Sequence, residues 1–219
     1  MATQCKNLGH AALARNGRSV SRSVFATGRG RARLRKMEGI APTDRVLLDM
    51  ALRQLEAVET ELVDLEREIV RLGKHLPGLS TVLQIRGLGV IAGIGVLAEI
   101  GDVHWFPSAR KLVGYAGLGA SVRRSNQTEH RGGITTQARK LLRTLLIQAV
   151  LAMLKANDHG ALVAFVRRKQ REKGSGKAIC ATARQLLTVI HVLLTTQLDY
   201  WFLEERLYQR KLKAVARAA

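Results

Sequence analysis

The chain has 219 residues, 47% of them hydrophobic, which is enough to bury a core and to form one or two domains. Its formal net charge of +19 at pH 7 indicates a polyanionic partner, with nucleic acid favoured over an acidic membrane surface. Only 4% of the residues are aromatic, which argues against a binding mode dominated by base stacking. Contacts to phosphates are therefore expected to supply the affinity.

The two cysteines, Cys5 and Cys180, are far apart in the sequence and belong to no C-x-x-C pair. A disulfide framework and a cysteine zinc site are therefore not indicated, and a reducing cytosol is expected. The longest apolar runs, at residues 90–97 and 186–195, are shorter than the roughly 20 residues that span a bilayer. The N-terminus lacks the apolar segment of a secretory signal. We expect a cytoplasmic protein that associates with nucleic acid and has no membrane partner.

Residues 1–41 form the first segment that differs in composition from the rest. They contain nine basic residues and one acid, Glu38, and are rich in Gly and Ser. This composition predicts a basic, flexible N-terminal arm that becomes ordered on a partner. A solvated leader without a role is the alternative for such a charge run.

A long amphipathic helix is predicted for residues 42–76, with Thr43 or Asp44 as its N-cap and Gly73 near its end. Apolar residues recur over four heptads in two series, Leu48, Leu55, Leu62, Ile69 and Ala51, Val58, Leu65, Leu72. The other faces carry the only acidic stretch of the chain, which disfavours contact with DNA. We predict a coiled coil, formed with a second copy or as a hairpin within the chain. The alternative is one long amphipathic helix that lies on the core.

Residues 79–212 are predicted to form short helices joined by glycine turns and then longer helices. Their apolar residues show no convincing alternation with a period of two, apart from short strands that are allowed near residues 119–134. The predicted fold class is therefore all-α or mostly α. A long coiled-coil helix would precede a compact helical domain.

Two glycines mark a tight turn between helices at residues 83–93. Gly87 and Gly89 allow positive φ and a close backbone approach, and the second helix would begin at Val90 with free N–H groups at its start. Such a turn can seat a phosphate, and it resembles the helix-hairpin-helix that holds a DNA backbone in repair and recombination proteins. We predict that Arg86, Gly87 and Gly89 contact nucleic acid. A plain turn within the core is the alternative.

One serine, Ser125, lies in a segment bracketed by glycines and arginines, residues 117–134. A helix predicted for residues 135–154 follows and presents one basic face. Guanidinium groups bind phosphate oxygens and stabilise the charge of a phosphoryl-transfer transition state. The predicted phosphate-binding residues are Arg123, Arg124, Arg131, Arg139, Lys140 and Arg143. Residue types alone favour Ser125 as a turn residue or phosphate contact over a nucleophile, because no activating base or metal site is evident beside it.

A complete active site is not evident in the sequence. No D-x-D, H-E-x-x-H or paired-carboxylate spacing is present, so neither a metal site nor a bound cofactor is predicted. The run from Lys173 to Lys177 lacks the spacing and the preceding strand of a Walker phosphate loop. It is instead predicted to be the turn before a helix over residues 177–195. On that helix Lys177 and Arg184 would face an anion together with the cluster at residues 167–169.

The order of short motifs resembles the C-terminal transposase domain of the IS-one-ten family of bacterial insertion sequences, including its eleven-eleven branch. The resemblance covers roughly residues 79–198, and the heptad helix resembles the coiled coil that precedes that domain. Its motifs are Ile85-Arg-Gly-Leu-Gly89, Leu97-Ala-Glu-Ile-Gly-Asp102, Phe106-Pro-Ser-Ala-Arg-Lys-Leu112, Tyr115-Ala-Gly-Leu118, Ser125-Asn-Gln-Thr128, Gly132-Gly-Ile-Thr135, Leu141-Leu-Arg143 and Gly176-Lys-Ala178.

The resemblance implies a serine-dependent recombinase. Such recombinases act as RNA-guided oligomers, and their serine, which corresponds to Ser125, is thought to form a transient phosphoserine link to DNA. A separate resolvase-like domain with four metal-binding acids precedes the coiled coil in the family. Only about 42 residues precede it here, so the chain is expected to be truncated and to meet magnesium only through a partner's metal domain.

The leading hypothesis is an insertion-sequence transposase, or its remnant, that binds DNA and a guide RNA and uses Ser125 for strand transfer. Its heptad helix would pair with a second copy or with a full-length transposase. The alternative is a non-catalytic DNA-binding or oligomerisation module derived from such an enzyme. A structural RNA-binding protein of the ribosomal kind is a third hypothesis.

Overall fold

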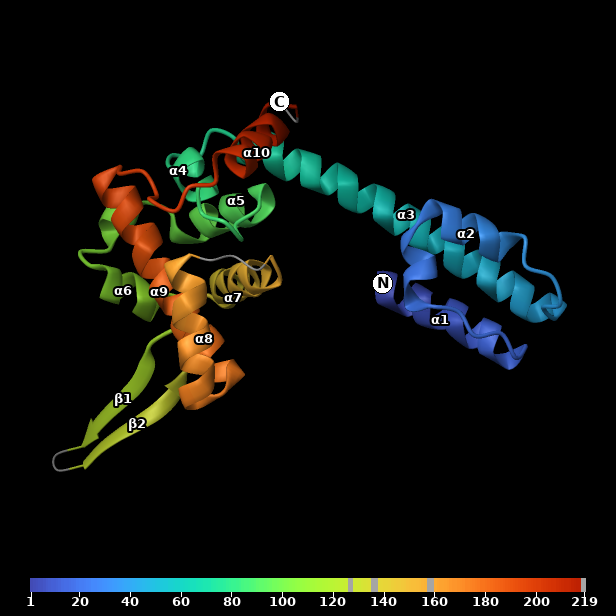
Figure 1. Cartoon of the computed structure of the whole chain (residues 1–219), viewed down its shortest axis with the longest axis horizontal. Helices are drawn as coiled ribbons and strands as arrows, with labels where there is room; N and C mark the ends of the chain where they lie inside the picture. The colour runs from blue at the N-terminus through green and yellow to red at the C-terminus, as the bar shows by residue number, and fades with distance from the viewer. Residues whose placement is uncertain (126–127, 135–137, 157–159, 218–219) are drawn as a thin grey trace. The chain divides into compact units, whose positions relative to one another are not determined.

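A computed structural model of the chain describes residues 1–125, 128–134, 138–156 and 160–217, with the backbone alone for 120–125 and 128–134. The described residues are mostly helical, which confirms the predicted fold class (Figure 1). They form two compact units, residues 1–67 and 68–219, and the longest helix, α3 (Pro42–Gly73), crosses from one into the other. The other elements of the first unit are α1 (Ala2–Arg15), the 3-10 helix η1 (Arg22–Ala26) and α2 (Gly28–Arg35).

The first unit differs from the flexible arm expected for residues 1–41. Apolar side chains of the arm pack against the first half of α3, where Leu13, Phe25, Leu34, Leu48 and Leu52 are at most 1% exposed. These apolar residues are scattered singly among basic ones, but helix formation brings them onto faces that α3 can cover.

Charge complementarity accompanies this packing. In ion pairs between the arm and the acidic face of α3, Arg31 approaches Glu59 and Arg35 approaches Glu56, each at 2.7 Å. Such partly exposed pairs contribute little each, so the buried apolar residues supply most of the stabilisation. The acidic helix thus makes protein contacts, as its charge predicts, and its partner includes the chain's own N-terminal segment.

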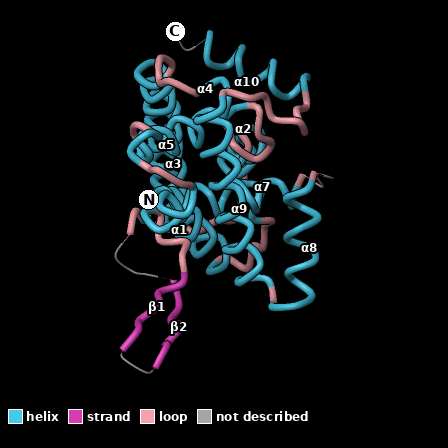
Figure 2. Tube along the Cα trace, turned by 90° about the vertical axis from the view of Figure 1, so that its left-hand side faces the viewer, coloured by secondary structure: helices cyan, strands magenta, loops and turns pink. Residues whose placement is uncertain are grey.

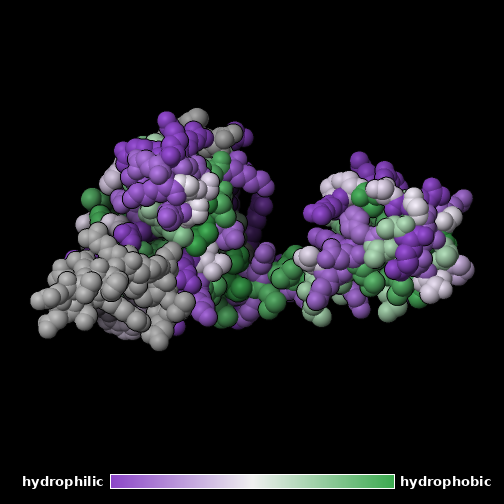
Figure 3. Space-filling view, turned by 90° about the horizontal axis from the view of Figure 1, so that it is seen from below, coloured by the Kyte–Doolittle hydropathy of each residue, from purple (hydrophilic) through white to green (hydrophobic). Residues whose placement is uncertain are grey.

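Along α3 the heptad residues have two different environments. Leu48 and Leu55, in the first half, are fully buried within the first unit. Leu62, Leu65 and Leu72, in the second half, are 49%, 59% and 66% exposed. Hydrophobic and hydrophilic side chains are both visible along the uncovered part of this helix (Figure 3). The predicted coiled coil with another chain would therefore use the second half of α3, and it stays a prediction.

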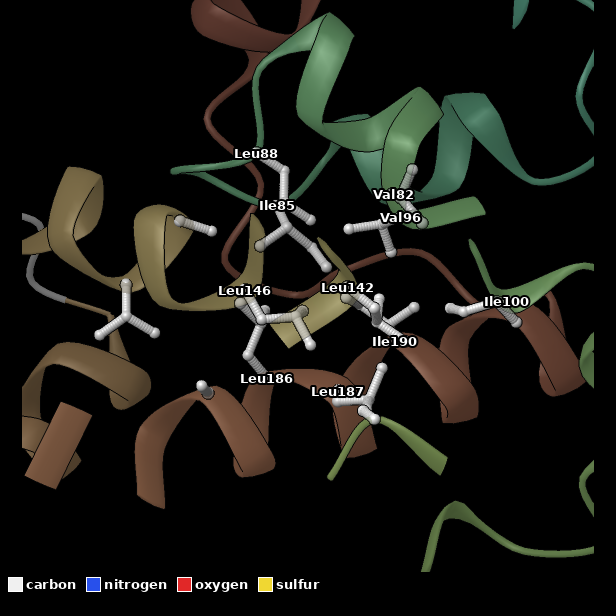
Figure 4. Packing of buried hydrophobic residues seen from close by; sticks show 14 of the residues in the cluster. Val82, Ile85, Leu88, Val96, Ile100, Leu142, Leu146, Leu186, Leu187 and Ile190 are labelled. Carbon is white, nitrogen blue, oxygen red and sulfur yellow. The ribbon is translucent and has the colours of Figure 1, made fainter. Parts of the chain in front are cut away.

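The second unit is built around α9 (Ser175–Thr196), which packs against α6, α7 and α8 and also contacts α4. Leu186, Leu187 and Ile190 of α9 are fully buried and meet Leu142 and Leu146 of α7 (Figure 4). The remaining elements are α4 (Leu79–Leu83), α5 (Val90–Ile100), η2 (Val103–Trp105), α6 (Ala109–Tyr115), β1 (Ala120–Ser125), β2 (Thr128–Ile134), α7 (Lys140–Lys155), α8 (Ala161–Lys173) and α10 (Glu205–Arg217).

By length and composition alone α9 could cross a membrane, since it has 22 residues with a mean hydropathy of 1.5 in its most apolar window. The apolar run at residues 186–195, which alone is too short, is part of this longer helix. Here α9 is the central helix of a folded core, and its alanine and leucine side chains fill the space between its neighbours. Core helices of this kind pass the same length and composition test.

An antiparallel hairpin, β1 with β2, extends away from the helices of the second unit (Figures 1 and 2). It lies within residues 119–134, where the sequence allows short strands. Ser125 pairs with Thr128 at one end and Ala120 with Ile134 at the other, and a register shift lies between Ala120 and Val122. Asn126 and Gln127, between the last pair, lie outside the described residues.

Candidate nucleic-acid interface

The expected turn between two helices is present at residues 84–89. Helix α4 ends at Leu83 and α5 begins at Val90, with Gly89 as its N-cap. Gly87 has a φ of +90°, and a Cβ at this position would lie 2.5 Å from the carbonyl oxygen of Ala149 in α7. Gly89 has an ordinary φ of −74°, and a Cβ there would meet nothing within 4 Å. Gly87 therefore allows close packing of the turn on α7, while Gly89 leaves the start of α5 open.

Arg86, the cation predicted to bind phosphate at this turn, is engaged within the chain. One of its terminal nitrogens lies 2.7 Å from a carboxylate oxygen of Glu204, and the other donates a hydrogen bond to the Ala156 carbonyl at 3.4 Å. Its side chain remains 32% exposed. A phosphate could reach this guanidinium only in competition with Glu204.

A segment near the C-terminus, residues 199–204, holds the turn from its other side. The Gln84 side-chain amide donates to the Asp199 carboxylate at 2.7 Å, and its oxygen accepts the backbone N–H of Tyr200 at 2.6 Å. Both ends of a buried amide are thus satisfied. This segment fixes the residue that directly precedes Ile85 and Arg86.

Lys211 of α10 adds a second link to the same turn. Its ammonium donates to the carbonyl oxygens of Leu83 and Ile85 at 2.7 and 2.8 Å. Burial lowers the pKa of Lys211 to about 8, although the nearby Glu204 carboxylate acts in the opposite direction. No sequence motif marks Lys211, because its two partners lie 128 and 126 residues away along the chain.

Lys211 should make the stability of the second unit depend on alkaline pH. Its folded pKa of about 8 is below the ordinary value of 10.5, so between these two values the unfolded chain binds more protons than the folded one. The free energy of unfolding should therefore rise with pH across this window. The rise should be about 1–2 kcal/mol, because Lys211 is only partly buried and solvent screens the effect.

Chemical denaturation of the wild type and Lys211→Met at several pH values measures this rise. The variant should lack it, while Lys213→Met, which removes an exposed cation of the same helix, should keep it. Parallel curves for the wild type and Lys211→Met would show that Lys211 is not the group responsible.

The hairpin carries four of the residues predicted from the sequence. Ser125 is the last residue of β1, and Arg123 and Arg124 directly precede it, paired with His130 and Glu129 of β2. Arg131 pairs with Val122, farther from the end of the hairpin. The described backbone thus places these residues on one two-stranded element, and their side chains lie outside the described part of the structure.

The base of the hairpin is fixed to the helical core. Arg184 of α9 donates two hydrogen bonds to the Leu118 carbonyl, from Nε at 3.1 Å and Nη2 at 2.8 Å, just before β1. Its charge predicts that Arg184 faces an anion, and this stays a prediction. In the structure its guanidinium binds a backbone carbonyl where the chain leaves the core. Lys177, on the first turn of α9, is exposed.

The basic residues expected after the hairpin lie at the start of α7, which begins at Lys140 rather than at residue 135. Residues 135–137 lie outside the described structure. Arg139 is the N-cap of α7, and its guanidinium lies 5.3 Å from the centre of the Tyr115 ring. Lys140 is exposed, and Arg143 lies one turn after Arg139 and is half-buried. The return from the hairpin is therefore also held against α6, through Tyr115.

Acidic and histidine side chains do not gather into a metal site in the described part of the chain. No group of three or more His, Cys, Asp or Glu residues there could hold a metal ion. The residues that the structure describes thus do not fit the four-acid magnesium site that the resemblance implies for a separate domain.

Comparison with known proteins finds a family match within the second unit. Residues 79–167 match the transposase IS116/IS110/IS902 family. The chain is 27% identical over 164 residues to the transposase for insertion sequence element IS1111A of Coxiella burnetii, covering 74% of this chain and 45% of that protein. It is 26% identical over 188 residues to a probable family 20 transposase of Pseudomonas aeruginosa, covering 81% and 56%.

A shorter match, 39% identical over 64 residues, is to the putative transposase y4qE of Sinorhizobium fredii and covers 29% of this chain and 16% of that protein. The chain spans about half the length of the two relatives that it matches over most of its own residues. The glycine turn, the hairpin with Ser125 and the basic start of α7 all lie within the matched residues 79–167. Within the second unit, residues 79–167 are therefore similar to the transposase domain of the IS116/IS110/IS902 family.

Proposed function

We propose that this chain is the nucleic-acid-binding and strand-transfer part of a DNA transposase. The observation that carries the proposal is that the family match includes a hairpin that projects from the helical core and ends β1 at Ser125, directly after two arginines. A net charge of +19 adds a general attraction to the DNA backbone. The fixed base of the hairpin would let the helical core set the position of Ser125.

In the proposed reaction the Ser125 hydroxyl attacks a backbone phosphorus and gives its proton to a base. A phosphoserine bond forms, the bond from phosphorus to a deoxyribose oxygen breaks, and that oxygen takes up a proton. Arg123, Arg124 and Arg131 would bind the phosphate oxygens, since bidentate guanidinium contacts stabilise charge on phosphate. The strand remains attached until a second hydroxyl displaces Ser125.

Partners complete the proposal. We propose that a separate metal domain supplies the magnesium-binding carboxylates, as the family resemblance implies, since no group of three or more His, Cys, Asp or Glu among the described residues could hold a metal ion. A guide RNA would select the DNA site, because phosphate contacts alone carry no sequence information. The exposed second half of the α3 heptads offers a surface for pairing with such a partner or with a second copy.

Trapping a covalent protein–DNA adduct tests this function. The chain is incubated with nicked duplex DNA, magnesium and a full-length family transposase whose own serine is replaced by alanine. After denaturation and digestion, mass spectrometry should find a nucleotide on the peptide that contains Ser125. Attachment at another residue would contradict the assignment of the nucleophile.

A non-catalytic binding or oligomerisation module is the second candidate function. The exposed Leu62, Leu65 and Leu72 favour it, since they offer an apolar surface for pairing with another chain. DNA binding without any adduct, with every partner tried, would select this candidate. Preference for structured ribosomal RNA over DNA would select the third hypothesis.

The ion pair at the glycine turn leads to a prediction for binding. Glu204→Gln removes the carboxylate that occupies Arg86 and should raise affinity for duplex DNA up to about fivefold, since exposed ion pairs contribute at most about 1 kcal/mol. Glu205→Gln is the matched control, because it removes the same charge at the next residue. The Glu205 carboxylate accepts a hydrogen bond from the Gln209 side chain and does not contact Arg86. Equal gains from both variants, measured by fluorescence anisotropy, would show that only net charge matters.

A further inference from the structure

Helix α10 carries a row of four cations and lies outside residues 79–167, which match the family. Arg206, Arg210, Lys213 and Arg217 are all exposed, and none of them forms an ion pair within the described residues. With about 100° of rotation per residue, their spacing of four, three and four places them within an arc of roughly 60° on one helix face. The only acid in the helix is Glu205, in its first turn.

The opposite face of α10 is committed to the core. Tyr208, Leu212 and Val215 pack against the buried cluster of the second unit. Lys211, beside this apolar face, binds the Leu83 and Ile85 carbonyls. A basic amphipathic helix that lies in a membrane interface inserts its apolar face into lipid. That face of α10 is already occupied, so only its cationic face remains for a partner.

The position of α10 connects the four cations to the glycine turn. Lys211 binds the carbonyls on either side of Gln84, and Glu204, one residue before α10, pairs with Arg86. The helix is therefore held at the turn that we propose to contact a nucleic-acid backbone. The eleven steps from Arg206 to Arg217 rise about 16 Å, a length over which one strand of a duplex presents about five phosphates.

We propose that Arg206, Arg210, Lys213 and Arg217 form a phosphate-binding stripe that extends the nucleic-acid interface of the glycine turn along α10. This inference rests on the proposed function, because it assigns a further part of the same interface. The stripe reads no sequence, since each of its contacts is to the backbone. It lengthens the bound segment and aligns it along the helix.

Two variants of α10 test the stripe. The first neutralises it through Arg206→Gln, Arg210→Gln, Lys213→Gln and Arg217→Gln. The second keeps the composition and net charge of the helix but moves three cations by about 100° around it, through Gln209→Arg with Arg210→Gln, Lys213→Ala with Ala214→Lys, and Ala216→Arg with Arg217→Ala. All the replaced residues are exposed, so both variants should keep the circular dichroism spectrum of the wild type.

Binding to duplex DNA is then measured over a range of salt concentrations. The neutralised variant should lose roughly tenfold or more in affinity, and its slope of log K against log salt should be smaller by up to about 3.6, or 0.9 per lost phosphate contact. The permuted variant should lose most of the same affinity. Wild-type affinity and slope in both variants would overturn the stripe, and wild-type binding by the permuted variant alone would show that net charge suffices.

Two further outcomes separate the inference from its alternatives. If the wild type shows no salt-dependent binding to DNA, the proposed function itself fails and the stripe with it. If both variants bind DNA like the wild type but lose binding to vesicles rich in phosphatidylserine, the stripe is a membrane contact and the inference is wrong.

Discussion

Replacing Ser125 by alanine is expected to abolish covalent attachment of this chain to DNA, a loss of roughly 10³-fold or more, because no other atom replaces a covalent nucleophile. The measurement is the yield of trapped adduct after incubation with nicked DNA and the nucleophile-deficient partner. Affinity for DNA should change by less than about twofold, because the arginines and the helical core remain and phosphate contacts supply the binding.

Ser121→Ala is the matched control for this loss. Ser121 belongs to the same strand, four residues before Ser125, and its replacement should leave the adduct yield near that of the wild type. A normal yield from Ser125→Ala would assign the chemistry elsewhere. Equal losses in both variants would indicate that the hairpin, rather than one hydroxyl, is required.

Replacing Gly87 by alanine is expected to destabilise the second unit by about 2–4 kcal/mol. Its φ of +90° disfavours any side chain, and the added Cβ would lie 2.5 Å from the Ala149 carbonyl oxygen and 2.7 Å from the Met153 side chain. Relief would require the turn to move away from α7. The free energy of unfolding in urea measures the loss, followed by fluorescence or circular dichroism.

Gly89 is the matched control for Gly87, since it belongs to the same two-glycine turn. Its φ is −74° and a Cβ would meet nothing within 4 Å, so Gly89→Ala should cost less than about 1 kcal/mol. Equal destabilisation by the two substitutions would contradict the close packing of Gly87 against α7. The turn motif thus contains one glycine required for packing and one that leaves the start of α5 accessible.

Local sequence patterns predicted much of the fold. The heptads of α3 and the glycines before α5 predicted a long and a short helix that start near the observed residues. Such elements can be predicted because hydrophobic periodicity and capping residues are local signals, set by residues one or two helical turns apart. They also allowed the short strands of the hairpin.

The folded state of residues 1–41 could not be predicted from local patterns. Its apolar residues Leu13, Phe25 and Leu34 are separated by basic and glycine-rich stretches, so composition indicated a flexible arm. Their burial arises from α3, which lies far along the chain and supplies both apolar contacts and carboxylates. Composition alone does not reveal that the apolar and basic residues of 1–41 match apolar residues and carboxylates of α3.

The candidate interface shows the same limit. The residue types and spacing identified the glycine turn and the arginines near Ser125, which all lie within the family match. They did not identify Lys211 or Glu204, because these residues meet the turn from more than 100 residues away. Charge also did not indicate that Arg184 donates two hydrogen bonds to the Leu118 carbonyl and so fixes the base of the hairpin.

The proposed activity and the α10 stripe both require the cationic helical domain to bind the nucleic-acid backbone. A salt titration of its affinity for unrelated duplex DNA sequences measures this binding. We predict that log K falls linearly with log salt, by about 0.9 for each phosphate neutralised, with a slope of several units that is the same for every sequence. A flat response to salt, or binding confined to one sequence, would contradict it.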